Sequence, residues 1–191
     1  ATQPEIALFT RETPASHLDA ASADIILRLG AHQQAEPFYS AQVGEEQIIV
    51  ITHPDNPVKD IEEAALRQLY TGQVEQWDAV VPGFDQPVQV WTYPDGEDSR
   101  QLFEAALFAD APPQVQGFLA PDPQAMLAAV SAEPGALGYI PRSWLVQGDV
   151  SELNLPADLA ARLLQPVLAV ASKEPQGKIR SLLSCLQNAQ K

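Results

Sequence analysis

The feature that most constrains the fold is a short, almost continuously apolar run at residues 47–52, which reads Gln-Ile-Ile-Val-Ile-Thr. β-Branched residues of this kind are enriched in strands. An uninterrupted apolar run, in place of alternating apolar and polar residues, is typical of a strand buried on both faces of a mainly parallel sheet. The run ends in the turn-rich segment 53–57, which contains two prolines. Residues 47–52 therefore predict a buried strand of an α/β protein.

Strands and helices are expected to alternate along the chain. The helix expected over 60–70 has apolar residues at helical spacing, with Asp60 as N-cap and Glu63 as the returning half of a capping box. Gly72 and Gly135 are expected to end helices in the left-handed conformation. The alternation predicts an α/β fold with mainly parallel sheets flanked by helices. Further strands are expected over 5–9, 24–27, 88–91, 137–140 and 166–170, and further helices over 15–23 (with Thr13 as N-cap), 99–108, 124–130 and 178–186.

The charge balance argues against two classes of partner. Eleven Lys and Arg side chains stand against 25 Asp and Glu side chains, giving a formal net charge of −14. Such a surface repels nucleic acid and anionic membranes, so we expect no nucleic-acid partner. No apolar run approaches the roughly 18–20 residues that a membrane-spanning helix needs, so we expect no membrane span in the mature chain. The same charge opposes capture of a free anion unless the site itself is basic.

The chain lacks the short motifs of common catalytic and cofactor sites. It has no Gly-x-Ser-x-Gly nucleophile turn, no Gly-x-Gly-x-x-Gly fingerprint and no Gly-x-x-x-x-Gly-Lys-Ser/Thr phosphate loop. His17, His32 and His53 do not have the spacing of a zinc site. Cys185 is the only cysteine, which excludes an intramolecular disulfide. We therefore expect no catalytic residue, no metal, no cofactor and no enzymatic activity.

Five segments carry recognisable patterns in a fixed order. Residues 134–140 read Pro-Gly-Ala-Leu-Gly-Tyr-Ile, and residues 66–77 read Leu-Arg-Gln-Leu-Tyr-Thr-Gly-Gln-Val-Glu-Gln-Trp. The other three are Pro54-Asp55-Asn56-Pro57-Val58, residues 95–100 with Phe103, and residues 162–168. These five resemble segments of the phosphate-binding-protein family, the extracytoplasmic receptors of high-affinity phosphate ABC transporters: its PGAIGYV strand, LRxIFxGxIxNW helix, lobe crossing, GSGTR…F loop and YPLxRPL return strand.

The resemblance implies a two-lobed fold of the type II periplasmic-binding-protein class. The first lobe is expected over residues 1–52 and 150–191, and the second over 53–149. Such a protein captures a small solute in the cleft between its lobes, which close about hinge strands near 48–52 and 163–170. The implied partners are that solute and an ABC transporter permease. The implied location is periplasmic or extracellular, with a lipid anchor upstream of Ala1 left open.

The implied ligand loop departs from the family. Glu97 stands in place of the family's serine and Asp98 in place of its glycine, while Tyr93 falls where the family carries an arginine. Carboxylates at a helix start occupy its N–H groups, and each repels an anion by roughly 4 kcal/mol at 4 Å and an effective dielectric near 20. Arg28 either offers a positive charge to the cleft or covers Leu29 at the surface. The candidate ligand-binding residues are Arg28, Tyr93, Gly96, Glu97, Asp98, Ser99 and Arg100.

These departures leave the solute open. Phosphate is the family's solute, whereas a less charged or partly cationic solute suits Glu97 and Asp98 better. The family's first strand, ligand loop and following helix also have no counterpart before Pro4, so we expect either a reduced first lobe or a sequence that starts late. The alternative function is an interaction or sensory module on the same fold that binds no solute.

Overall fold

The computed structural model describes residues 9–11, 13, 22–30, 39–108, 115, 117–147 and 149–188. The strand expected over 5–9 and the helix expected over 15–23 lie almost wholly outside these ranges. Within the described ranges, no helix is both long enough and apolar enough to cross a membrane.

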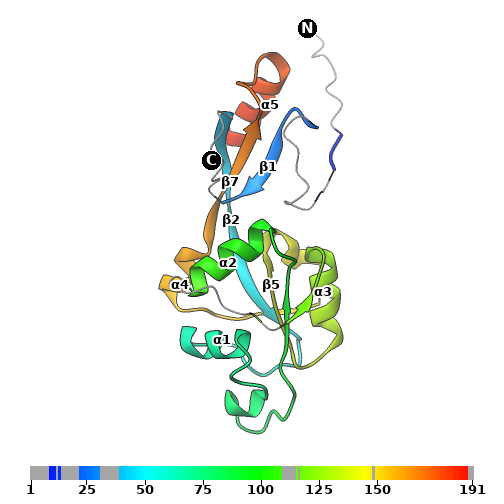
Figure 1. The fold of residues 1–191 in the computed structure, drawn as a ribbon, viewed down its shortest axis with the longest axis vertical. Helices are drawn as coiled ribbons and strands as arrows, with labels where there is room; N and C mark the ends of the chain where they lie inside the picture. The colour runs from blue at the N-terminus through cyan, green and yellow to red at the C-terminus, as the bar shows by residue number, and fades with distance from the viewer. Residues whose placement is uncertain are drawn as a thin grey trace. The chain divides into compact units, whose positions relative to one another are not determined.

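The elements alternate as expected for an α/β protein (Figure 1). They are, in chain order, β1 (Ile26–Leu29), β2 (Tyr39–Thr52), α1 (Glu63–Tyr70), η2 (Trp77–Ala79), β3 (Gln89–Thr92), α2 (Asp98–Phe108), β4 (Phe118–Leu119), α3 (Pro123–Ala132), β5 (Ala136–Pro141), η3 (Arg142–Gln147), β6 (Ser151–Glu152), α4 (Ala157–Arg162), β7 (Leu164–Ala171) and α5 (Gly177–Asn188). The expected α/β class is therefore confirmed. The strands β4 and β6 and the helix α4 were not expected.

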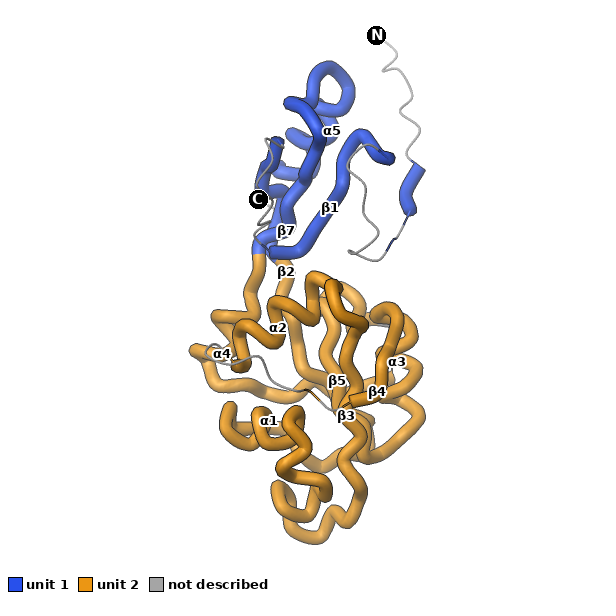
Figure 2. Tube along the Cα trace, viewed as in Figure 1, with its two compact units in different colours: residues 1–45, 166–191 blue, residues 46–165 orange. Residues whose placement is uncertain are grey.

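The chain divides into two compact units (Figure 2). Unit 1 comprises residues 1–45 and 166–191, and unit 2 comprises residues 46–165. The chain passes between them twice, once within β2 and once within β7. The lobe boundaries expected at 52/53 and 149/150 remain a prediction.

Unit 1 contains β1, α5 and most of β7. Strand β1 pairs antiparallel with β7, with Ile26 opposite Val170 and Leu29 opposite Val167. Helix α5 is amphipathic, and Cys185 lies on its exposed side. The hydrophobic core of this unit consists of Val43, Ala169 and Leu183, with Ile25, Tyr39, Val167 and Leu186 packed against it.

Unit 2 is built on a mixed sheet in the order β2-β5-β3-β4. The pairs β3–β5 and β3–β4 are parallel, whereas β2 runs antiparallel to both β5 and β6. The sheet is therefore mixed, not mainly parallel as expected. The reason is that β5 leads through η3 to β6, which returns along β2 with Thr52 opposite Ser151. Residues 48–52 are buried, as the uninterrupted apolar run predicts.

Helices cover both faces of this sheet. Gly138 and Tyr139 are neighbours in β5 and so point to opposite faces. A Cβ atom at Gly138 would lie 2.6 Å from Met126 Sδ, so this glycine permits the close approach of α3. On the other face the ring of Phe103 from α2 stacks on Tyr139 with centroids 4.0 Å apart. Large buried side chains thus fill unit 2 on both sides of β5.

Two expectations about helix ends are wrong. Helix α1 begins at Glu63, because Asp60 instead accepts a hydrogen bond from Asn154 Nδ2 at 3.0 Å and lies outside the helix. Its N-cap residue makes no side-chain cap, so no capping box forms. Gly72 does adopt positive φ, at 69°, but Gly135 does not. A Cβ atom at Gly135 would lie 2.0 Å from the Pro87 carbonyl oxygen, so space, not handedness, requires glycine there.

Candidate functional site

The candidate site in unit 2 is the loop that joins β3 to α2, residues 93–97. Gly96 has φ of 90°, a conformation that glycine adopts at little cost and other residues avoid. Glu97 N donates to Pro94 O at 3.4 Å, which closes the turn. Helix α2 then begins at Asp98, one residue before the start that the sequence predicts. Six of the seven predicted ligand residues therefore lie on one short segment.

Arg100 lies in the first turn of α2 and reaches back along this loop. Its Nη1 contacts Asp95 Oδ1 at 2.8 Å and donates to Tyr93 O at 2.8 Å. Its Nε donates to Glu104 Oε1 at 2.8 Å. Burial lowers the pKa of Arg100, but the bond to Glu104 and the charges of Glu104 and Asp95 outweigh that effect and raise it. The guanidinium is therefore charged and engaged by three acceptors of its own chain.

Tyr93 belongs to the core of unit 2. Its side chain is only 2% exposed, and its ring meets Tyr139 edge-on with centroids 5.3 Å apart. Burial, followed by Tyr139, Asp122 and Glu97, raises the pKa of Tyr93 well above the ordinary value. Tyr93 therefore offers its backbone carbonyl to Arg100 while its hydroxyl stays inside the unit.

The loop and the first turns of α2 are acidic. Residues 95–104 contain Asp95, Glu97, Asp98 and Glu104 against Arg100, so four carboxylates and one guanidinium leave a net charge of −3. An anion approaching this segment meets net repulsion, in spite of the helix N-terminus that begins there. A neutral or cationic group meets no such repulsion. Within the described ranges, no group of three or more His, Cys, Asp or Glu side chains could hold a metal ion.

Arg28 lies in the other unit. It is the third residue of β1, pairs with Leu168 of β7 and is partly buried. Leu29, beside it, is partly buried as well. The predicted contribution of Arg28 to solute binding stays a prediction.

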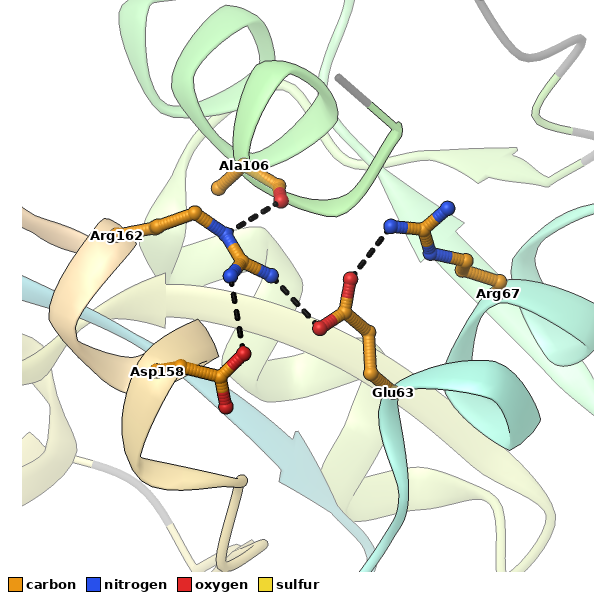
Figure 3. A network of polar contacts seen from close by, with 5 residues as sticks. All are labelled: Glu63, Arg67, Ala106, Asp158 and Arg162. Atoms are coloured by element: carbon orange, nitrogen blue, oxygen red, sulfur yellow. Dashed lines mark hydrogen bonds and ion pairs between the residues drawn. The ribbon is translucent and has the colours of Figure 1, made fainter. Parts of the chain in front are cut away.

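A polar network in unit 2 was not foreseen (Figure 3). The Glu63 carboxylate accepts from Arg67 at 2.5 Å and from Arg162 at 2.7 Å. Arg162 also donates to Ala106 O at 3.1 Å and to Asp158 at 3.2 Å. The bond from Arg67, joined by that from Arg162, outweighs burial and lowers the pKa of Glu63. The network fastens α4 to α1 and α2 just before β7 begins.

The comparisons with known proteins identify the family. Residues 15–173 match the family described as PBP superfamily domain, and the chain belongs to that superfamily. Its fold is that of the type II periplasmic binding proteins, as the resemblance implies. Over 87% of its length it superimposes, with a TM-score of 0.75 and 22% identity, on 73% of a protein of Clostridium perfringens assigned as a phosphate ABC transporter substrate-binding protein and solved with bound phosphate.

Two further relatives agree with this fold. An ABC-type phosphate transport receptor of Vibrio cholerae matches 91% of the chain with a TM-score of 0.63 and 18% identity, over 77% of that receptor. The phosphate-binding protein PstS of Bacillus subtilis (strain 168) is 26% identical over 121 residues, which are 63% of this chain. The chain spans only 40% of the length of that PstS.

Proposed function

We propose that the chain is an extracytoplasmic solute-binding protein that delivers a small solute to an ABC transporter permease. The observation that carries the proposal is the division into two compact units joined by two strand crossings. Two units linked in this way are suited to closing around a ligand by bending at the crossing strands. Membership of the PBP superfamily and the similarity to phosphate receptors support the same conclusion.

The proposed solute contact in unit 2 is the β3–α2 loop, residues 93–100. The relatives are named for phosphate, which makes phosphate the first solute to test. The net charge of −3 over residues 95–104 disfavours a phosphate anion. One unscreened repulsion of roughly 4 kcal/mol equals the whole binding free energy of about a millimolar complex. A small solute less negative than phosphate therefore suits this loop better.

Native mass spectrometry of protein purified from the expressing cells tests the proposal. A solute receptor is expected to carry one small molecule per chain, with a mass that identifies it. Thermal-shift screening of the stripped protein against phosphate, neutral solutes and amines should then give a rise in Tm with the matching solute, because binding to the folded state alone stabilises it. If no molecule co-purifies and no solute raises Tm, the transport proposal fails.

The acidic loop also favours a second function, an interaction or sensory module that binds no solute. This module would keep the two-unit scaffold while the charges of residues 95–104 exclude the ancestral anion. Pull-down with the tagged chain separates the two functions. Recovery of an ABC permease supports delivery of a solute, and recovery of a kinase or surface protein in its place supports the module.

A further inference from the structure

Arg100 is placed to control the shape of the β3–α2 loop. Its side chain starts in the first turn of α2 and contacts both the first residue of the loop, Tyr93, and its third residue, Asp95. The same guanidinium contacts Glu104, one turn further along α2. One side chain therefore ties two points of the loop to the helix that follows it.

The three contacts use the particular shape of a guanidinium. Nη1 serves Asp95 Oδ1 and Tyr93 O, while Nε serves Glu104 Oε1, all at 2.8 Å. Arginine presents several donors in a rigid planar fork, whereas the lysine ammonium is a single point of charge. A lysine at this position would retain the charge without reaching all three acceptors.

The burial of the partners separates the structural contacts from the weak one. The Arg100 side chain is 17% exposed and that of Glu104 is 24% exposed, whereas Asp95 is 92% exposed. An ion pair with an exposed partner contributes little stability by itself. The contacts with Tyr93 O and Glu104 lie where water is largely displaced, and they hold the arginine in place.

We infer that Arg100 is a positioning residue of the proposed site: it fixes the conformation of the β3–α2 loop and does not itself bind the solute. The inference rests on the proposed function, since it assigns a role within that site. Two carboxylates and a carbonyl already engage the guanidinium, so an anion would have to displace them or share it with them. The arginine therefore shapes the loop without making it basic.

Hydrogen exchange of the loop amides, 95–99, tests the positioning role without any solute. Arg100→Gln should accelerate exchange of these amides at least tenfold, while Arg100→Lys should lie between that variant and the unchanged protein. Arg142→Gln is the matched control, because it breaks an ion pair with Glu152 in the same unit and should leave the loop amides unchanged. Unchanged loop exchange in Arg100→Gln would overturn the inference. If Arg100→Gln does not fold, Glu104→Gln takes its place, and the same acceleration is expected.

Titration with inorganic phosphate tests the second half of the inference. Asp95→Asn removes one acceptor from the guanidinium, and a positioning residue predicts no gain in phosphate affinity. A tenfold or greater gain, abolished when Arg100→Gln is added, would show that Arg100 is an anion ligand held back by Asp95. Failure of the proposed function alone would appear as absence of any solute with the loop exchange still dependent on Arg100.

Discussion

Replacing Gly135 with alanine tests the claim that space alone requires glycine at this position. The added Cβ atom would lie 2.0 Å from the Pro87 carbonyl oxygen, which is backbone and cannot rotate away. Carbon–oxygen contacts are comfortable near 3.3 Å, so the two chain segments would have to separate by roughly 1.3 Å. That movement strains two hydrogen bonds to the Gly135 carbonyl, from Trp77 Nε1 and from Gln89 N, both at 2.9 Å.

The expected cost follows from these two effects. Overpacking costs about 1–3 kcal/mol, and a buried donor left without its partner costs about 1–3 kcal/mol more. The Trp77 side chain is completely buried, so its indole N–H has no water to turn to. The sum, about 3–5 kcal/mol, is a large share of the 5–15 kcal/mol that stabilises a typical domain.

Urea denaturation followed by tryptophan fluorescence measures this change in the free energy of unfolding. Gly83→Ala is the matched control: Gly83 has φ of 89° but nothing within 4 Å of an added Cβ. It should cost only the roughly 1–2 kcal/mol of an unfavourable backbone conformation. A loss below 1 kcal/mol in Gly135→Ala, or a loss no greater than that of Gly83→Ala, would refute the steric explanation.

Three further predictions concern unit 2. Because the pKa of Glu63 is lowered, its contribution to stability is present above the ordinary carboxyl pKa and is lost as pH falls through the lowered one; Glu63→Gln should flatten the fall in Tm between pH 6 and pH 3, and an unchanged profile would contradict this. The buried hydroxyl of Tyr70 has no partner, so Tyr70→Phe should be neutral or stabilising, whereas Tyr139→Phe loses a 2.8 Å bond to Thr92 and should cost about 1 kcal/mol in urea denaturation; the reverse order would be incompatible with these contacts. Asp122→Ala removes the side-chain cap of α3 and should cost about 1 kcal/mol by the same assay, with no loss if the cap is unimportant.

The sequence predicted the strands of unit 2 because their burial is written into consecutive residues. The run at 47–52 lies at the buried end of β2, and residues 137–140 lie within β5. The start of α1 was missed because Asp60 bonds to Asn154, a residue 94 positions away. No local pattern reports such a partner, so the capping box looked complete when it was not.

The candidate site was predictable only in its local parts. The loop before α2 could be placed because Gly96 and the helix that follows are neighbours in the sequence. The three contacts of Arg100 could not be read from residue types, since its basic side chain suggests a ligand group as readily as a structural one. In the network around Glu63, the pair with Arg67 has the familiar spacing of four residues, but the pair with Arg162 spans 99 and appears only in three dimensions.

The most direct test of the central claim is isothermal titration of the stripped protein with inorganic phosphate, run beside the solute that native mass spectrometry identifies. A receptor scaffold with an acidic β3–α2 loop predicts tight, one-to-one binding of that solute. For phosphate it predicts a Kd of about a millimolar or weaker, given the scale of one charge repulsion. Micromolar phosphate binding would contradict the reading of Glu97 and Asp98, and absence of binding by any co-purified solute would contradict the receptor function itself.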